Sequence, residues 1–68
     1  MKKYWTITAN ESQGNQTASV DKSGAFSFLG TEAFSFETKK AAEEILTQVE
    51  KENANNPFLS FSLSSYEN

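Results

Sequence analysis

The chain has 68 residues and a formal net charge of −3, and all of its basic residues are lysines. It contains no cysteine and no histidine, which excludes disulfides and thiolate chemistry and removes the commonest metal ligand and general base. Arginine, whose forked side chain reads guanine and clamps phosphate, is also missing, so we do not expect binding to double-stranded nucleic acid.

A single domain over residues 1–68 is the organisation that this length predicts. A chain of this size buries only about 60% of the surface that its unfolded form exposes. Such small domains usually need disulfides, a metal or self-association for stability, and we therefore expect a homo-oligomer. No apolar run approaches the roughly 20 residues of a membrane span. The first residues are not followed by the apolar core of a signal peptide, so we expect no membrane partner and a cytoplasmic location.

Alternation of apolar and hydroxyl side chains predicts a first strand over residues 3–9. The polar residues 10–16 predict a loop. We expect residues 17–29 to form a hairpin of two strands, because the sequence Asp21-Lys22-Ser23-Gly24 between them is typical of a tight turn.

The tetrapeptide AFSF occurs twice, at residues 25–28 and 33–36. A tight turn at Gly30 and Thr31 would place the phenylalanines of the two copies on opposite faces of the sheet. An odd-length connection that includes Leu29 would gather them on one face. A third alternative is that the second copy is an extended lead-in to the helix. We favour the lead-in, with both copies directed toward the core.

The clearest element is a helix that begins at Lys39, with Thr38 as its N-cap. An asparagine-rich segment before Pro57 ends it. A last strand is expected over residues 58–66. The sequence thus predicts an α+β fold, in the order β-β-β-α-β, in which one helix packs on one face of a small antiparallel sheet of three or four strands. The apolar side chains of the helix repeat at the spacing of a single face: Ala42, Ile45, Leu46 and Val49.

Few residues are suited to catalysis. The serines have no histidine base and no Gly-x-Ser-x-Gly elbow. The helix glutamates Glu43, Glu44, Glu50 and Glu52 diverge around its outer surface, which favours a solvated face over a paired acid–base or cation site. The turn at residues 21–24 lacks the alternating acids of a calcium loop. We therefore expect no enzyme activity, no metal and no cofactor.

The second face of the predicted sheet is rich in hydroxyl groups. It can be an ordinary solvated face, a binding surface for a flat ligand, or a contact between copies. The last strand has no charge between Pro57 and Tyr66, so it lacks the lysines that usually guard an edge, and this favours pairing between copies. The residues expected on this face are Tyr4, Thr6, Thr8, Thr17, Ser19, Ser27, Phe58, Ser60, Ser62, Ser64 and Tyr66.

The run YWTIT…SVDKSGAFSF…AFSFETKKAAEEIL resembles small phage and mobile-element proteins. These begin with a strand, pass through a D-x-x-G hairpin, and carry F-x-[ST]-x-x-x-A at the start of a helix. Phe36, Thr38 and Ala42 occupy the positions of that motif. The resemblance implies a compact, non-catalytic anti-defence protein that blocks a host enzyme or sequesters a host signal.

Two functions are therefore expected. The first is an oligomeric inhibitor that blocks a host protein by direct contact, because the acidic helix face suits a basic partner. The alternative is a protein that sequesters a small nucleotide-like signalling molecule between subunits. A third hypothesis, a fragment that its partner orders, predicts that the isolated chain is unfolded. The residues expected to bind the small molecule are Lys3, Tyr4, Trp5, Thr6, Ser64 and Tyr66.

Overall fold

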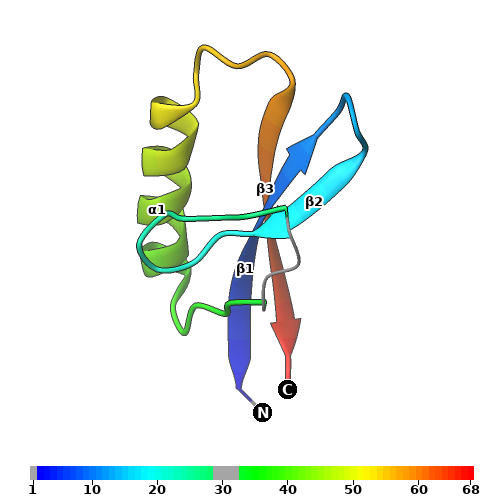
Figure 1. Cartoon of the computed structure of the whole chain (residues 1–68). Coiled ribbons are helices and arrows are strands. Elements are labelled where there is room, and N and C mark those ends of the chain that lie inside the picture. The colour runs from blue at the N-terminus through cyan, green and yellow to red at the C-terminus, as the bar shows by residue number, and fades with distance from the viewer. Residues whose placement is uncertain (1, 29–32) are drawn as a thin grey trace.

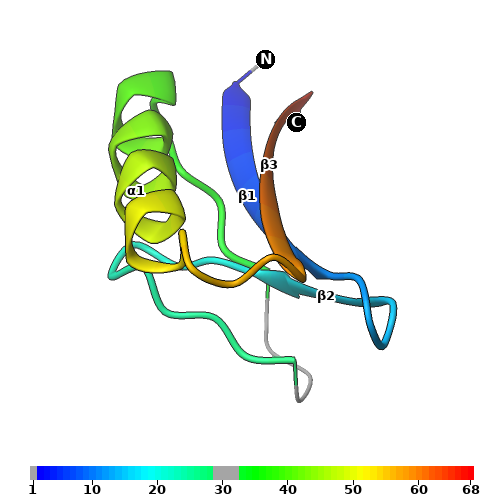
Figure 2. The same cartoon turned by 90° about the horizontal axis from the view of Figure 1, so that it is seen from above.

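The computed structural model describes residues 2–28 and 33–68. The elements follow in the order β1 (Lys3–Glu11), β2 (Gln16–Ser19), α1 (Lys39–Glu52) and β3 (Leu59–Glu67). The strands form an antiparallel sheet in the order β2-β1-β3, and α1 packs on one face of it (Figure 1 and Figure 2). The α+β class, with one helix on one face of a small antiparallel sheet, is confirmed.

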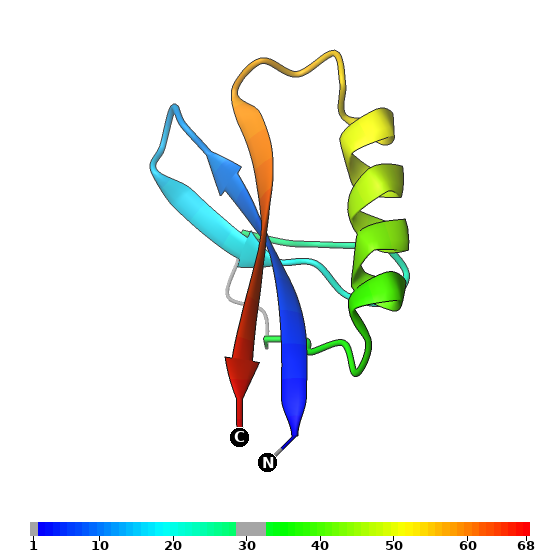
Figure 3. The same cartoon turned by 180° about the vertical axis from the view of Figure 1, so that it is seen from behind.

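The central strand β1 pairs with β3 along its whole length. The start of β1 and the end of β3, and with them the two termini, lie side by side (Figure 3). β1 also forms a hairpin with β2 through residues 12–15, which is tighter than the loop expected over residues 10–16. The Glu11 carboxylate closes this turn by accepting hydrogen bonds from the backbone N–H groups of Gln13 (2.9 Å) and Gly14 (2.7 Å). Asn15 takes the positive φ of 52° that the reversal requires.

Residues 25–28 do not form the strand that the hairpin over residues 17–29 would need. The turn itself is present, since Asp21 Oδ1 accepts bonds from Ser23 N (2.9 Å) and Ala25 N (3.1 Å). The chain runs from β2 to the side of α1, turns there, and residues 25–28 come back toward β2 without pairing with it (Figure 1). The Phe26 ring meets the Phe61 ring of β3, with centroids 5.5 Å apart. A strand paired to the outer edge of β2 would be separated from β3 by both β2 and β1, and its side chains would not reach Phe61.

The second AFSF copy, residues 33–36, is an extended lead-in to α1, as expected. It is fixed to the sheet by one bridge, in which Trp5 and Phe36 exchange backbone bonds of 2.9 and 2.7 Å. Phe36 is buried, and Phe34 packs edge-on against it. The connection between the two copies, where the sequence left alternative turn lengths open, lies outside the described residues.

The core lies between α1 and the apolar face of the sheet. Thr38 caps the helix as expected, because its Oγ1 accepts a bond from Ala41 N (3.1 Å). The partly buried side chains of Ile45, Leu46 and Trp5 pack around the centre. The buried apolar residues are Ile7, Ala9, Ala18, Val20, Phe36, Ala42 and Val49.

We expect Ile7→Ala to lower the free energy of unfolding by about 2–5 kcal/mol, because the side chain has no exposed surface and leaves a cavity. Urea unfolding followed by circular dichroism measures this change. Thr6→Ala is the matched control on the other face of the same strand, and we expect it to cost less than about 1 kcal/mol. Equal losses from the two substitutions would contradict the assignment of faces.

The turn at Asp21 predicts a specific pH dependence. Hydrogen bonds from the Ser23 hydroxyl and from the backbone of Ser23 and Ala25 hold the pKa of Asp21 below its usual value. A lowered folded-state pKa gives stability that is present above the unfolded-state pKa and is lost as the pH falls through the folded-state pKa. The Tm advantage of wild type over Asp21→Asn should therefore be present at neutral pH and shrink below about pH 4. A pH-independent difference in Tm would contradict this.

Candidate functional site

The face of the sheet turned away from α1 carries hydroxyl and amide groups (Figure 2). No described helix or further strand packs on it, and residues 27–28 and 33–35 border it. The strand register aligns these side chains in rows. Two rows span all three strands: Ser19, Thr8 and Ser62, and Thr17, Asn10 and Ser60. Directly paired residues share a face, so the alternation seen in the sequence is realised in space. We call this surface the open face. Its members are Tyr4, Thr6, Thr8, Asn10, Thr17, Ser19, Ser60, Ser62, Ser64 and Tyr66.

Two tyrosines mark one end of the open face. Tyr4 and Tyr66 are directly paired, and their rings stack with centroids 5.6 Å apart. The Tyr66 and Ser35 hydroxyl oxygens lie 2.6 Å apart, which ties the lead-in segment to β3. Lys2 Nζ lies 5.5 Å from the Tyr4 ring and 3.3 Å from Glu37 Oε1, and the Glu37 carboxylate raises the pKa of Lys2. The rings are thus held in place, while Tyr66 remains 44% exposed.

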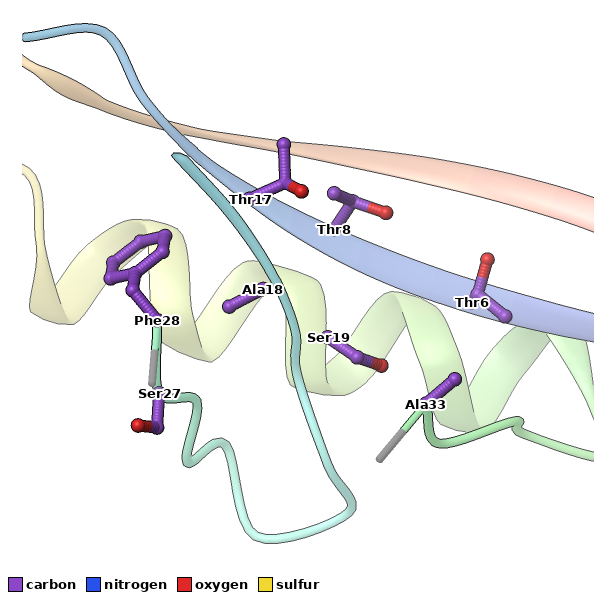
Figure 4. A pocket seen from close by; sticks show the side chains of 8 residues that line it. All are labelled: Thr6, Thr8, Thr17, Ala18, Ser19, Ser27, Phe28 and Ala33. Atoms are coloured by element: carbon purple, nitrogen blue, oxygen red, sulfur yellow. The ribbon is translucent and has the colours of Figure 1, made fainter. Parts of the chain in front are cut away.

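A shallow groove of about 410 Å³ runs along the outer edge of β2 (Figure 4). Thr6, Thr8 and Thr17 project into the same region from neighbouring strands. Ser19 Oγ also lines it and accepts a hydrogen bond from Phe34 N (3.0 Å). This lining offers hydroxyl donors and acceptors, but no charged side chain from the described residues, and therefore suits neutral polar groups. Its other lining residues are Ala18, Ser27, Phe28 and Ala33.

A second groove, of about 270 Å³, lies where the helix-facing side of the sheet meets the start of α1. Lys3 Nζ lies 5.9 Å from the centroid of the Trp5 ring. Lys39 is the first residue of α1, and the first turn of this helix contains no acidic residue. The groove is therefore lined by two lysines and the Trp5 ring. We call this the basic groove, and its lining residues are Lys3, Trp5, Lys39, Leu63, Ser64 and Ser65.

The structure does not bring the six residues predicted to bind a ligand into one pocket of a single subunit. Tyr4 and Trp5 are neighbours in β1, and successive side chains of a strand point to opposite faces. Ser64 lies at the boundary, because it pairs with Thr6 in the open-face register and also lines the basic groove. The open face holds Tyr4, Thr6 and Tyr66, and the basic groove holds Lys3, Trp5 and Ser64.

Sequence reasoning missed Lys39 and Ser65 as members of the basic groove. A signal for Lys39 was present, since a lysine in the first turn of a helix stands where the helix dipole favours an acid. Ser65 and the contacts of Ser35 carry no local signal, because they depend on how distant segments meet in space.

In comparisons with known proteins, the chain matches no family model, no curated protein and no solved structure. Among the described residues, no group of three or more acidic, histidine or cysteine side chains is arranged to hold a metal ion. The described residues form no helix with the length and the apolar character needed to cross a membrane. A function is therefore inferred from the surfaces of the molecule.

Proposed function

We propose that this chain is a non-enzymatic binding protein that inhibits a host protein by direct contact in the host cytoplasm, as the resemblance to small phage proteins implies. The observation that carries the proposal is the acidic outer surface of α1. Its four glutamates are exposed, and none of them forms an ion pair with a described residue. These residues are Glu43, Glu44, Glu50 and Glu52.

This surface is presented by a helix whose position is fixed. Ala42 and Val49 bury the inner side of α1 in the core, so the carboxylates project from a rigid support. The four carboxylates outnumber Lys40 and Lys51, which are also exposed on α1, so the surface is net negative. A net-negative patch attracts a partner of the opposite sign and disfavours partners of the same sign. The acidic surface, on a chain whose net charge is −3, therefore favours a host protein that presents a basic patch.

We expect the combined change Glu43→Gln, Glu44→Gln and Glu52→Gln to weaken partner binding by about tenfold or more. Glutamine keeps a similar helix propensity, so α1 is retained. The matched control combines Ser12→Lys, Gln13→Lys and Gln16→Lys at the β1–β2 turn. Each set makes the chain more positive by three charge units and takes the net charge from −3 to 0.

Quantitative mass spectrometry of host proteins retained by each variant, at low and high salt, measures this effect. Proteins with basic surfaces should be retained by wild type and by the control, released by high salt, and lost with the glutamine variant. Equal retention by the glutamine variant and wild type would contradict a contact through α1.

We infer a second candidate, the sequestration of a nucleotide-like signalling molecule, from the basic groove. The ammonium groups of Lys3 and Lys39 supply the positive charge that a phosphate needs in a chain without arginine. The Trp5 ring suits stacking on a base, and the hydroxyls of Ser64 and Ser65 suit a ribose or a phosphate oxygen. The shallow groove beside β2 has no lysine among its lining residues, so the basic groove is favoured for this ligand class.

Trp5 fluorescence tests the second candidate, with ADP-ribose, a cyclic dinucleotide and inorganic pyrophosphate as separate probes. We expect the Trp5 emission to change as ligand is added and to reach a plateau at a fixed ratio of ligand to protein. The ligand should be recovered chemically unaltered. Lys3→Gln combined with Lys39→Gln should weaken binding by about tenfold or more. Lys22→Gln combined with Lys51→Gln removes the same charge elsewhere and should leave binding unchanged. Equal affinity of the two double variants would exclude the basic groove as the site.

A further inference from the structure

β3 is an edge strand of the sheet for its full nine residues. Lys2 and Asn68 exchange backbone bonds of 3.1 and 2.9 Å, and Ser12 N donates to the Phe58 carbonyl (2.9 Å). Such bonds recur at every second residue of an antiparallel pair. The even-numbered residues of β3 therefore bond to β1, and the odd-numbered residues direct their N–H and C=O groups outward. The Leu59 N–H donates to the Asn56 carbonyl (3.3 Å), and no described element pairs with the other outward groups.

This outer edge lacks the features that usually prevent strand addition. Edge strands are commonly short, bulged or guarded by charged residues and proline. β2, at the other edge of the sheet, has only four residues. β3 pairs with β1 residue by residue without a bulge, and its first charged residue is Glu67, at its end. The edge of β3 can therefore accept another strand.

We propose that β3 pairs antiparallel with β3 of a second copy, about a two-fold axis at Ser62, so that the three-stranded sheets of two copies become continuous. In this register, outward-facing residues oppose outward-facing residues, as the hydrogen bonds require. Phe61 lies opposite Leu63 of the second copy on the apolar face. Ser60 lies opposite Ser64, and Ser62 lies opposite its own copy, on the open face.

The register also covers the most exposed apolar side chains. Phe58 and Tyr66 are 45% and 44% exposed, and they are the exposed large hydrophobic residues of the described chain. With the axis at Ser62, Phe58 of one copy lies opposite Tyr66 of the other. Aromatic pairs directly across two strands stabilise a sheet. The second copy thereby extends the pair of stacked tyrosines of the open face with a third ring.

Neighbouring registers are less favourable. An axis at Leu63 would place Leu59 opposite Glu67, which sets an apolar side chain against a charge. An axis at Phe61 would place Tyr66 opposite Asn56 and Phe58 opposite Ser64, so that neither exposed ring would meet another ring. The register centred on Ser62 pairs only uncharged residues between Phe58 and Tyr66 and brings no like charges together, although each copy carries a net charge of −3.

Charges beside the edge complement each other in the same register. A groove at one end of the β3 edge is lined by Glu50, Leu59 and Ser60. The basic groove, at the other end, is lined by Lys39 and Ser65 among others. The axis at Ser62 sets Leu59 of one copy opposite Ser65 of the other. The Glu50 groove of one copy therefore adjoins the Lys39 groove of the other, twice in each dimer, which favours a second copy of this chain as the occupant.

Sedimentation equilibrium of wild type, Ser62→Lys and Ser62→Glu tests this pairing, whichever partner the dimer binds. We expect wild type to dimerise, and each variant alone to have a dimer dissociation constant raised by about fivefold, because like charges then meet on the axis. An equimolar mixture of the two variants should dimerise at least as well as wild type, since opposite charges then face each other. Thr47→Lys, on the outer side of α1, is the control and should leave dimerisation unchanged.

Circular dichroism confirms that each variant is folded, and amide hydrogen exchange locates the contact. The amides of Phe61 and Leu63 should become protected as the dimer forms. A wild-type chain that stays monomeric up to millimolar concentration would overturn the proposal. So would a dimer in which these two amides stay exchangeable, or a mixture of the Ser62 variants that dimerises no better than each alone.

Discussion

The constraint on which this structure depends is that one amphipathic helix can cover only one face of a three-stranded sheet. α1 seals the apolar face by placing Ala42 and Val49 against Ile7 and Ala9, and residues 25–28 complete the cover. The other face has to be compatible with water, and strand alternation supplies hydroxyls at every second position of β1 and β3. The open face, the free edge of β3 and the acidic outer side of α1 all follow from this one-sided core.

Much of the fold could be predicted from the sequence, because several local signals agreed. The Thr38 cap and the apolar spacing of the helix located α1, and alternation assigned the faces of β1 and β3. Strand pairing was harder to predict. Phe26 and Phe28 alternate as a strand would, but Phe26 reaches Phe61 of β3 across the core and Phe28 packs edge-on against Phe26, and neither pairs with β2. The open face could be predicted in the same way, whereas the division of the ligand-binding residues between two sides required the observed strand register and the position of α1.

The proposed surfaces are not independent of one another. The dimer through β3 brings the Glu50 groove of one copy next to the lysines of the basic groove in the other. Those lysines then face carboxylates, which disfavours phosphate binding at the same place. Pairing through β3 and sequestration of a nucleotide in the basic groove are therefore competing uses of the same lysines. Glu43 and Glu44 lie nearer the start of α1 than Glu50 does, and contact with a basic host protein through them is compatible with the dimer.

A soluble paramagnetic probe in an NMR experiment measures whether the sheet has one sealed face and one open face. Ile7 lies between Thr6 and Thr8 in β1, and all three carry methyl groups that report on opposite sides of the same strand. We expect strong relaxation of the Thr6 and Thr8 methyl signals and little relaxation of those of Ile7, because Ile7 is buried in the core. Equal protection of all three residues would show that the hydroxyl face is also covered, and would contradict the account.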